Sequence, residues 1–158
     1  PRQSRNMKGE ILVYRIVNME AKHLEQVHDI EKECFSIPWS KKQLEREITE
    51  NNLAYYIVAL DGEEVVGYGG MWLIVTEGHI TNIAVKEKYR RKGIGDIILK
   101  DLISFAEKKQ FMGITLEVRI SNLTAQKLYT KNGFKIEGFR KDYYRDTHED
   151  AIIMWKYF

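Results

Sequence analysis

The stretch Arg90-Arg91-Lys92-Gly93-Ile94-Gly95 decides how this sequence of 158 residues is interpreted. A strand pattern over 79–85 precedes it, and an amphipathic helical pattern over 94–108 follows it. Glycine lets the backbone approach a ligand closely, and the free N–H groups of a helix N-terminus favour a bound phosphate. The stretch is therefore a candidate cradle for a pyrophosphate, although a surface turn with a solvated basic run explains the same residues equally well.

Two other phosphate-binding motifs fit this stretch less well. A Rossmann fingerprint needs a third glycine where Ile98 stands, and its fold needs more than one βαβ unit, although Glu117 lies near the spacing of the ribose-binding acid. A P-loop ends in Gly-Lys-Ser or Gly-Lys-Thr, which this site lacks. The sequence therefore disfavours nucleotide hydrolysis.

Strand and helix patterns alternate on both sides of the stretch. Ser40 and Gln43 form a capping box before a helix, and Asp61-Gly62 predicts a hairpin turn. Gly133 stands where a helix needs a left-handed C-terminal cap. Strands are expected over 11–19, 55–60, 64–74, 79–85, 114–119, 134–143 and 150–156, and helices over 24–34, from residue 40 onward, and over 94–108 and 122–132. These elements predict an α/β fold with a mixed, mostly antiparallel sheet flanked by helices.

The chain shows no internal domain boundary. It has no repeat, low-complexity tract or Gly/Ser linker, so residues 11–158 are predicted to form a single domain. Pro1 to Asn6 are polar and precede Met7, a candidate native start, so residues 1–10 are predicted to be a tag remnant or a flexible N-terminus.

Composition limits the classes of function. A hydrophobic content of 44% is ordinary for a globular domain, and a formal charge of +2 lacks the excess of a dedicated nucleic-acid binder. No stretch approaches the ~20 apolar residues of a membrane span, and the N-terminus lacks a signal-peptide pattern. The single cysteine, Cys34, falls in an apolar helical stripe and is expected to be a small buried hydrophobe. We expect a cytoplasmic protein that binds neither nucleic acid nor membrane.

Further motifs accompany the cradle: "IPWS" at 37–40, "TNIAV" at 81–85, "LEVRISN" at 116–122, "LYTKNGF" at 128–134, "RKDYY" at 140–144 and "EDAIIM" at 149–154. With them the sequence resembles the GNAT superfamily of acetyltransferases, whose Q/R-x-x-G-x-G/A motif is matched by Arg90, Gly93 and Gly95. Within it, nearly the whole chain is similar to the ribosomal-protein-alanine N-acetyltransferases, the RimI group. One departure is Lys86-Glu87-Lys88, where many members carry a proline.

The resemblance implies a single-domain GNAT fold and transfer of acetyl from acetyl-CoA to a protein N-terminal amine, most closely the N-terminal alanine of a small-subunit ribosomal protein. It implies Glu117 as general base, Tyr129 as general acid, and a backbone N–H near Val85 that polarises the carbonyl. It implies no metal. The cofactor residues that it implies are Ile83, Ala84, Val85, Arg90, Arg91, Lys92, Gly93, Ile94, Gly95 and Asn122.

By spacing alone, the two catalytic candidates have simpler explanations. Alternation along the strand 114–119 puts Glu117 on the face opposite its apolar neighbours, where an ion pair with Arg119 is the simpler interpretation. For Tyr129, in mid-helix, core packing is the ordinary role. Acceptor-groove candidates, for which simple packing is an equal alternative, are Phe35, Pro38, Trp39, Tyr143 and Tyr144.

The acceptor remains open at this stage. Related enzymes act on lysine, and a small amine such as a polyamine or an antibiotic is a further alternative. A non-enzymatic alternative is an acetyl-CoA sensor or a nucleic-acid module that uses the basic run 86–92. The four histidines show no metal-ligand spacing, so we expect no metal and assign them no role.

Overall fold

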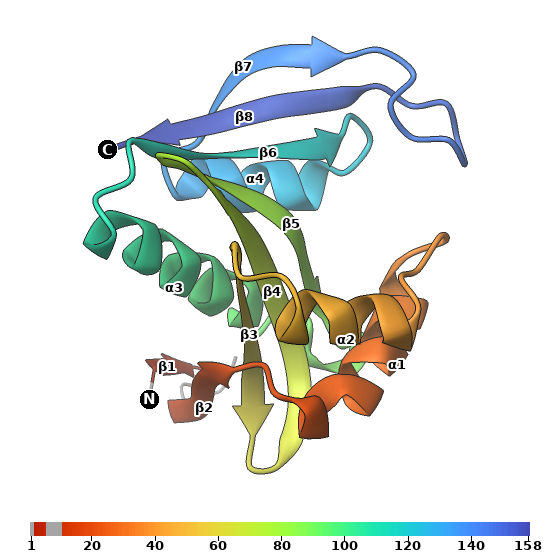
Figure 1. Ribbon diagram of the computed structural model, residues 1–158, viewed down its shortest axis with the longest axis vertical. Coiled ribbons are helices and arrows are strands. Elements are labelled where there is room, and N and C mark those ends of the chain that lie inside the picture. The colour runs from red at the N-terminus through yellow and green to blue at the C-terminus, as the bar shows by residue number, and fades with distance from the viewer. Residues whose placement is uncertain (1, 6–10) are drawn as a thin grey trace.

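The computed structural model describes residues 2–5 and 11–158. Within this part of the chain, eight strands form one sheet in the order β1-β2-β3-β4-β5-β6-β8-β7 (Figure 1). Their bounds are β1 (Arg2–Arg5), β2 (Ile11–Asn18), β3 (Ala54–Asp61), β4 (Glu64–Ile74), β5 (Glu77–Val85), β6 (Gly113–Arg119), β7 (Lys135–Arg140) and β8 (Ala151–Tyr157). β5 and β6 are parallel, and the other neighbouring pairs are antiparallel. The predicted mixed, mostly antiparallel sheet is confirmed.

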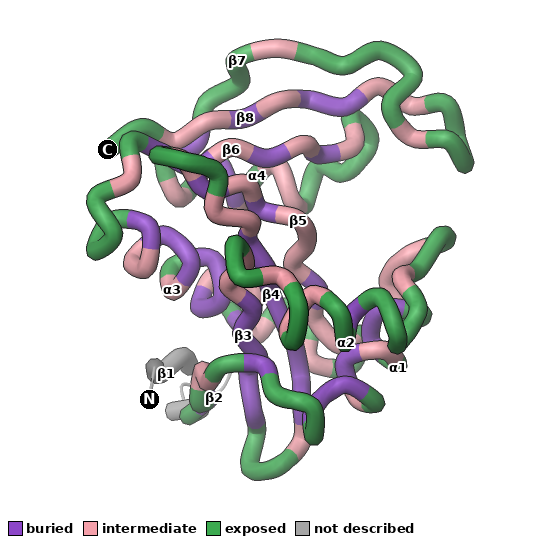
Figure 2. Tube along the Cα trace, in the orientation of Figure 1, coloured by how far each residue is buried: buried purple, intermediate pink, exposed green. Residues whose placement is uncertain are grey.

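Helices cover both faces of the sheet. They are α1 (Leu24–Cys34), α2 (Lys41–Thr49), α3 (Ile94–Lys108) and α4 (Leu123–Lys131), with short 3-10 turns at Ala21–His23 and Glu87–Tyr89. Successive residues of a strand point to opposite faces. Along β3, Tyr56 and Val58 pack into the cluster of α1 and α2, whereas Ile57 and Ala59 pack into the cluster of α3. The central strands are therefore buried on both sides, as the purple segments of β3 and β4 show in Figure 2.

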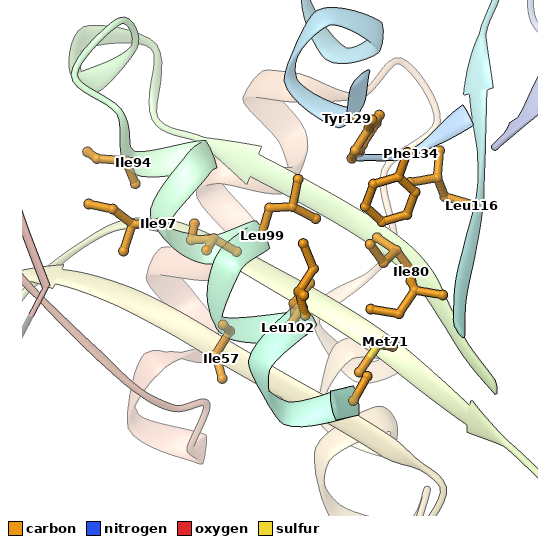
Figure 3. Packing of buried hydrophobic residues seen from close by; sticks show 14 of the residues in the cluster. Ile57, Met71, Ile80, Ile94, Ile97, Leu99, Leu102, Leu116, Tyr129 and Phe134 are labelled. Atoms are coloured by element: carbon orange, nitrogen blue, oxygen red, sulfur yellow. The ribbon is translucent and has the colours of Figure 1, made fainter. Parts of the chain in front are cut away.

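One apolar cluster connects α3 to the later strands and to α4. Figure 3 shows this cluster from Ile94 at the start of α3 to Tyr129 and Phe134 at the other end. Leu99 and Leu102 of α3 and Leu116 of β6 are almost completely buried in it. Because close-packed interiors tolerate little displacement, α4 is held in a fixed position relative to β6.

The sheet opens between its two parallel strands. β5 pairs with β6 only over Glu77–His79 and Gly113–Thr115. On its other edge, β5 carries a bulge, since Ile80 and Asn82 face consecutive residues of β4 and Thr81 is the extra residue. Beyond these points β5 and β6 diverge (Figure 1), so their facing edges no longer pair with each other.

Local predictions made from turn and cap residues are confirmed. Ser40 Oγ accepts from the Gln43 amide at 3.1 Å, and the Ser40 amide donates to Gln43 Oε1 at 2.8 Å. Gly62 and Gly133 have φ of 62° and 92°, the left-handed values that glycine allows. The helix expected over 94–108 has these bounds, and the βαβ unit is present.

Near both ends of the chain, the observed elements differ from the predicted ones. The strand expected over 134–143 is shorter, because the chain from 141 to 150 forms a loop instead. At the N-terminus, Arg2–Arg5 pairs antiparallel with β2, next to the expected domain start at residue 11. The rest of the segment predicted to be a tag remnant or flexible N-terminus, residues 1 and 6–10, lies outside the described residues. In the part of the chain described, no helix is long and apolar enough to cross a membrane.

Candidate active site

The divergence of β5 and β6 leaves a cleft of about 480 Å³. Its walls come from β5, β6, the start of α4, the α1–α2 loop (residues 35–40) and the β7–β8 loop (residues 141–150). The predicted site residues that line it are Phe35, Trp39, Ile83, Glu117, Asn122, Tyr129, Tyr143 and Tyr144. The predicted residues that lie outside its walls are Pro38, Ala84, Val85, Arg90, Arg91, Lys92, Gly93, Ile94 and Gly95.

The candidate cradle adjoins the cleft at the end of β5 and the start of α3. Arg91 and Gly93 adopt left-handed φ values of 63° and 80°, which turn the chain sharply before the helix. Gly93 is the N-cap of α3 and has no side chain to cap it, so the first amides of the helix remain available to an anion. The Ile94 side chain is buried in the core and fixes this turn to the sheet.

Gly95 lies in the first turn of α3 and is not required by the packing of the protein. A Cβ at this position would lie 3.5 Å from Leu128 and 3.8 Å from Val85, both ordinary contacts. Alanine is also the better helix former. A glycine at this position would let an anion approach the backbone of α3 closely, so the residues present are compatible with a pyrophosphate.

Arg90 organises the end of β5. Its Nε donates to the Val85 carbonyl at 3.2 Å, and its Nη2 lies 3.3 Å from Cys34 Sγ. The thiol in turn donates to the Val85 carbonyl at 3.6 Å. Cys34 is thus half-buried and has polar neighbours, which corrects the expectation of a buried hydrophobe. Burial raises the pKa of the Cys34 thiol, and Arg90 opposes that shift.

Glu117 lines the cleft, and its two carboxylate oxygens contact His79 and Arg140. Its Oε2 lies 2.6 Å from His79 Nε2, and its Oε1 accepts from Arg140 Nε at 3.3 Å. The hydrogen bond from His79 lowers the pKa of Glu117 most, Arg140 lowers it further, and burial opposes both. The expected alternative, an ion pair with Arg119, is wrong, because Arg119 pairs with Asp146 and Glu149 of the β7–β8 loop instead.

Tyr129 belongs to α4 and lines the cleft. Asn122 caps this helix, since its Oδ1 accepts from the Ala125 amide at 3.1 Å. The Tyr129 ring is 8% exposed and packs edge to face on Phe134 with centroids 5.7 Å apart. Burial raises the pKa of the Tyr129 phenol above its ordinary value, so the group keeps its proton and is available as a donor.

The α1–α2 loop and the β7–β8 loop lie on the same side of the molecule (Figure 1), and residues of both line the cleft. Arg119, at the end of β6, fastens the β7–β8 loop: it donates to Asp146 at 2.8 Å and to Glu149 at 3.2 Å, and lies 4.0 Å from the Tyr144 ring centroid. Asp146 also accepts from the Ser36 hydroxyl of the α1–α2 loop. Arg119 and Ser36 hold the pKa of Asp146 at about 2. The two loops are therefore connected directly.

Three residues at the cleft were not predicted from the sequence. His79 contacts Glu117, although no role was assigned to the histidines. Glu31 and Asn82 line the cleft wall. Little in the sequence pointed to these residues. Glu31 extends the apolar stripe of α1 by one position. His79 lies on β5, the strand beside β6, which carries Glu117.

The comparisons with known proteins agree with this geometry. A family model described as "Acetyltransferase (GNAT) family" matches residues 24–134. A Bacillus subtilis relative is 38% identical over 138 residues, which cover 87% of this chain and 91% of the relative. That relative is provisionally named [ribosomal protein bS18]-alanine N-acetyltransferase. An N-alpha-acetyltransferase of Sulfurisphaera tokodaii is 32% identical over 154 residues, 89% of this chain and 91% of its own.

A solved structure has the same fold. The ribosomal-protein-S18-alanine N-acetyltransferase from Escherichia coli superposes with a TM-score of 0.83 at 30% identity, covering 90% of this chain and 92% of its own. The family match and the Bacillus subtilis relative make the chain an acyltransferase that uses acetyl-CoA. The chain belongs to the acetyltransferase (GNAT) family.

Proposed function

We propose that this acetyltransferase transfers the acetyl group of acetyl-CoA to the α-amine of a protein N-terminus, most closely the N-terminal alanine of the small-subunit ribosomal protein bS18. The observation that carries the proposal is the cleft that holds Glu117 and Tyr129 beside the cradle at the start of α3. The relatives named for alanine N-acetylation and for N-alpha-acetylation support this acceptor class. The same relatives support a cytoplasmic location.

Acetyl-CoA would be held along the open edge of β5 and at the start of α3. The backbone of Ile83 to Val85 would pair with the pantetheine arm, and the amides of residues 91–95 would bind the pyrophosphate. Asn122 lies in the cleft wall, where it would contact the cofactor. The bound thioester supplies the activated acetyl group, and a backbone N–H near Val85 would polarise its carbonyl.

Glu117 and Tyr129 would move the protons of the reaction. The Glu117 carboxylate would take the proton that the amine loses as the new C–N bond forms, directly or through a water molecule. Its lowered pKa keeps it ionised at neutral pH, and its contacts with His79 and Arg140 keep it in place. The Tyr129 phenol would give its proton to the departing thiolate, a role that needs the protonated form.

The acceptor class follows from amine ionisation. A peptide α-amine has a pKa of ~8, whereas a lysine or alkyl amine has a pKa of ~10.4, so the α-amine is far more often neutral near pH 7. A carboxylate base with a lowered pKa cannot deprotonate an ordinary lysine ammonium readily. The described chemistry therefore favours an N-terminal acceptor over lysine and over small polyamines.

The test is a comparison of three acceptors: an alanine-first peptide, spermidine, and an N-blocked peptide with one internal lysine. We expect the alanine-first peptide to have the highest kcat/KM, a pH limb near ~8, and an acetyl group placed on the terminal nitrogen by mass spectrometry. Peptides that differ in terminal-amine pKa show whether this limb belongs to the substrate. Preference for spermidine, or modification confined to lysine, would overturn the acceptor and leave the acetyl transfer intact.

A further inference from the structure

Glu31 is a carboxyl group inside the cleft wall that the acetyl transfer itself does not use. It lies on the last turns of α1, is 3% exposed, and lines the same cleft as Glu117. A carboxyl so deeply buried needs hydrogen-bond partners to offset its lost hydration. Its partners therefore indicate what the side chain holds in place.

Three donors converge on Glu31 from different parts of the fold. Oε1 accepts from the Trp39 amide at 3.0 Å, and Trp39 belongs to the α1–α2 loop. Oε2 accepts from the Tyr68 hydroxyl of β4 and from Asn82 Nδ2 of β5 at 3.4 Å. Asn82 Nδ2 also lies 3.2 Å from the Tyr68 hydroxyl, so Glu31, Tyr68 and Asn82 form a closed triangle.

These partners join the two substrate-binding sides of the cleft. Asn82 directly precedes Ile83, the first strand residue proposed to pair with the cofactor, and follows the bulge residue Thr81, whose hydroxyl donates to Asn82 Oδ1 at 2.8 Å. Trp39 is a cleft-wall residue of the loop that faces the acceptor side. Glu31 thus connects the β5 edge to the α1–α2 loop by one hydrogen bond on each side.

We propose that Glu31 is a positioning residue that holds the α1–α2 loop at a fixed place relative to the β5 edge, so that the acceptor amine meets the acetyl group. The role rests on the proposed function of the cleft. Burial raises the pKa of the Glu31 carboxyl against the opposing bonds from Trp39 and Asn82, which agrees with a group that is enclosed by protein donors. Glu31 touches neither reacting group and contributes through Trp39 and Asn82.

The first experiment compares Glu31→Gln with the wild-type chain. The amide has one oxygen for two sets of donors, and its NH₂ must face either the Trp39 N–H or the Tyr68–Asn82 side. We expect the Trp39 amide to exchange with deuterium about 10- to 100-fold faster, the range for losing a hydrogen bond to a charged group. Amides of β3 and β4 should keep their protection, because the core is unchanged.

The kinetic readout separates this role from general stability. In Glu31→Gln, KM for an alanine-first peptide should rise about tenfold or more, while KM for acetyl-CoA stays within about twofold. Glu45→Gln is the matched control: Glu45 is exposed on α2, close in sequence to the same loop, and loses the same charge. We expect Glu45→Gln to match the wild type in exchange and in both KM values.

A second variant protects the test against misfolding. Glu31→Met with Tyr68→Phe removes the carboxyl and its buried hydroxyl donor together, a change that keeps packing and leaves fewer unpaired groups. It should release the Trp39 amide and raise the peptide KM in the same way. Unchanged Trp39 exchange and peptide KM in either folded variant would overturn the proposal, as would an equal rise in both KM values with core amides exposed. Wild-type preference for spermidine, or modification confined to lysine, would refute the proposed acceptor instead, since the Trp39 exchange result does not depend on it.

Discussion

Replacing Gly95 by alanine tests whether this glycine is needed for folding or for binding a ligand. Gly95 is the second residue of α3, and a Cβ there would meet only Leu128 at 3.5 Å and Val85 at 3.8 Å. Both are ordinary van der Waals distances, so the protein itself has room for the methyl group. If no ligand approaches the Gly95 backbone, alanine should therefore disturb no contact at this position.

The two effects of Gly95→Ala have opposite signs. Alanine is up to about 1 kcal/mol better than glycine in a helix, which raises Tm by roughly 2–4 °C in a domain of this size. The methyl group would stand where the pyrophosphate must approach the amides. Overpacking a contact by one such group costs about 1–3 kcal/mol, or about 5- to 150-fold in Kd for acetyl-CoA. We therefore expect a more stable protein that binds its cofactor less well.

Calorimetric titration with acetyl-CoA and a thermal melt, run on the same preparation, measure the two effects. Gly69→Ala is the matched control, because its Cβ would lie 2.5 Å from Ile98 Cγ2 and the core must shift. That variant should lose stability and, while folded, keep its cofactor affinity. A lower Tm for Gly95→Ala, or an unchanged Kd, would refute the assignment of the cradle.

Three further predictions concern the cleft. Glu117→Gln and Tyr129→Phe should each lower kcat by about 10² to 10⁴ with little change in acetyl-CoA affinity, and near-normal turnover in both would return them to structural roles. In His79→Ala, Glu117 loses the hydrogen bond that most lowers its pKa, so the acid limb of kcat/KM should move to higher pH; an unmoved limb in a folded variant would show that Glu117 is not the titrating base. Ser36→Ala removes the hydroxyl that bridges to Asp146 and should raise the peptide KM about two- to tenfold at constant kcat, as steady-state kinetics would show; an unchanged KM would mean that the bridge plays no part in acceptor binding.

Most of the fold is readable from local sequence signals, because local chemistry determines where its elements begin and end. The Ser40–Gln43 capping box, the left-handed Gly62 and Gly133, and the apolar stripe of α3 each occur where the pattern predicts them. The chain from 141 to 150 was expected to be strand in part and forms a loop instead. Its conformation depends on Arg119, which is distant in sequence and fastens the loop through Asp146.

The candidate site, like the fold, could be predicted from the sequence only in part. Glu117 and Tyr129 were found through family motifs, and both line the cleft. The contacts around them were not found, because a contact across a sheet or between two loops produces no regular spacing in the sequence. His79 lies 38 residues before Glu117, and Ser36 lies 110 residues before Asp146. Periodicity along one element cannot reveal such pairs.

Glu117 and Glu31 line the same cleft in opposite environments, and this difference would decide which of them can serve the reaction. Glu117 has two donors, His79 and Arg140, and its lowered pKa keeps a negative charge at the cleft surface. Glu31 is enclosed by donors that belong to the protein itself, and burial raises its pKa. A peptide ammonium that entered the cleft would therefore be attracted to Glu117. Glu31 can influence that amine only by fixing the loop and the strand edge between which it must pass.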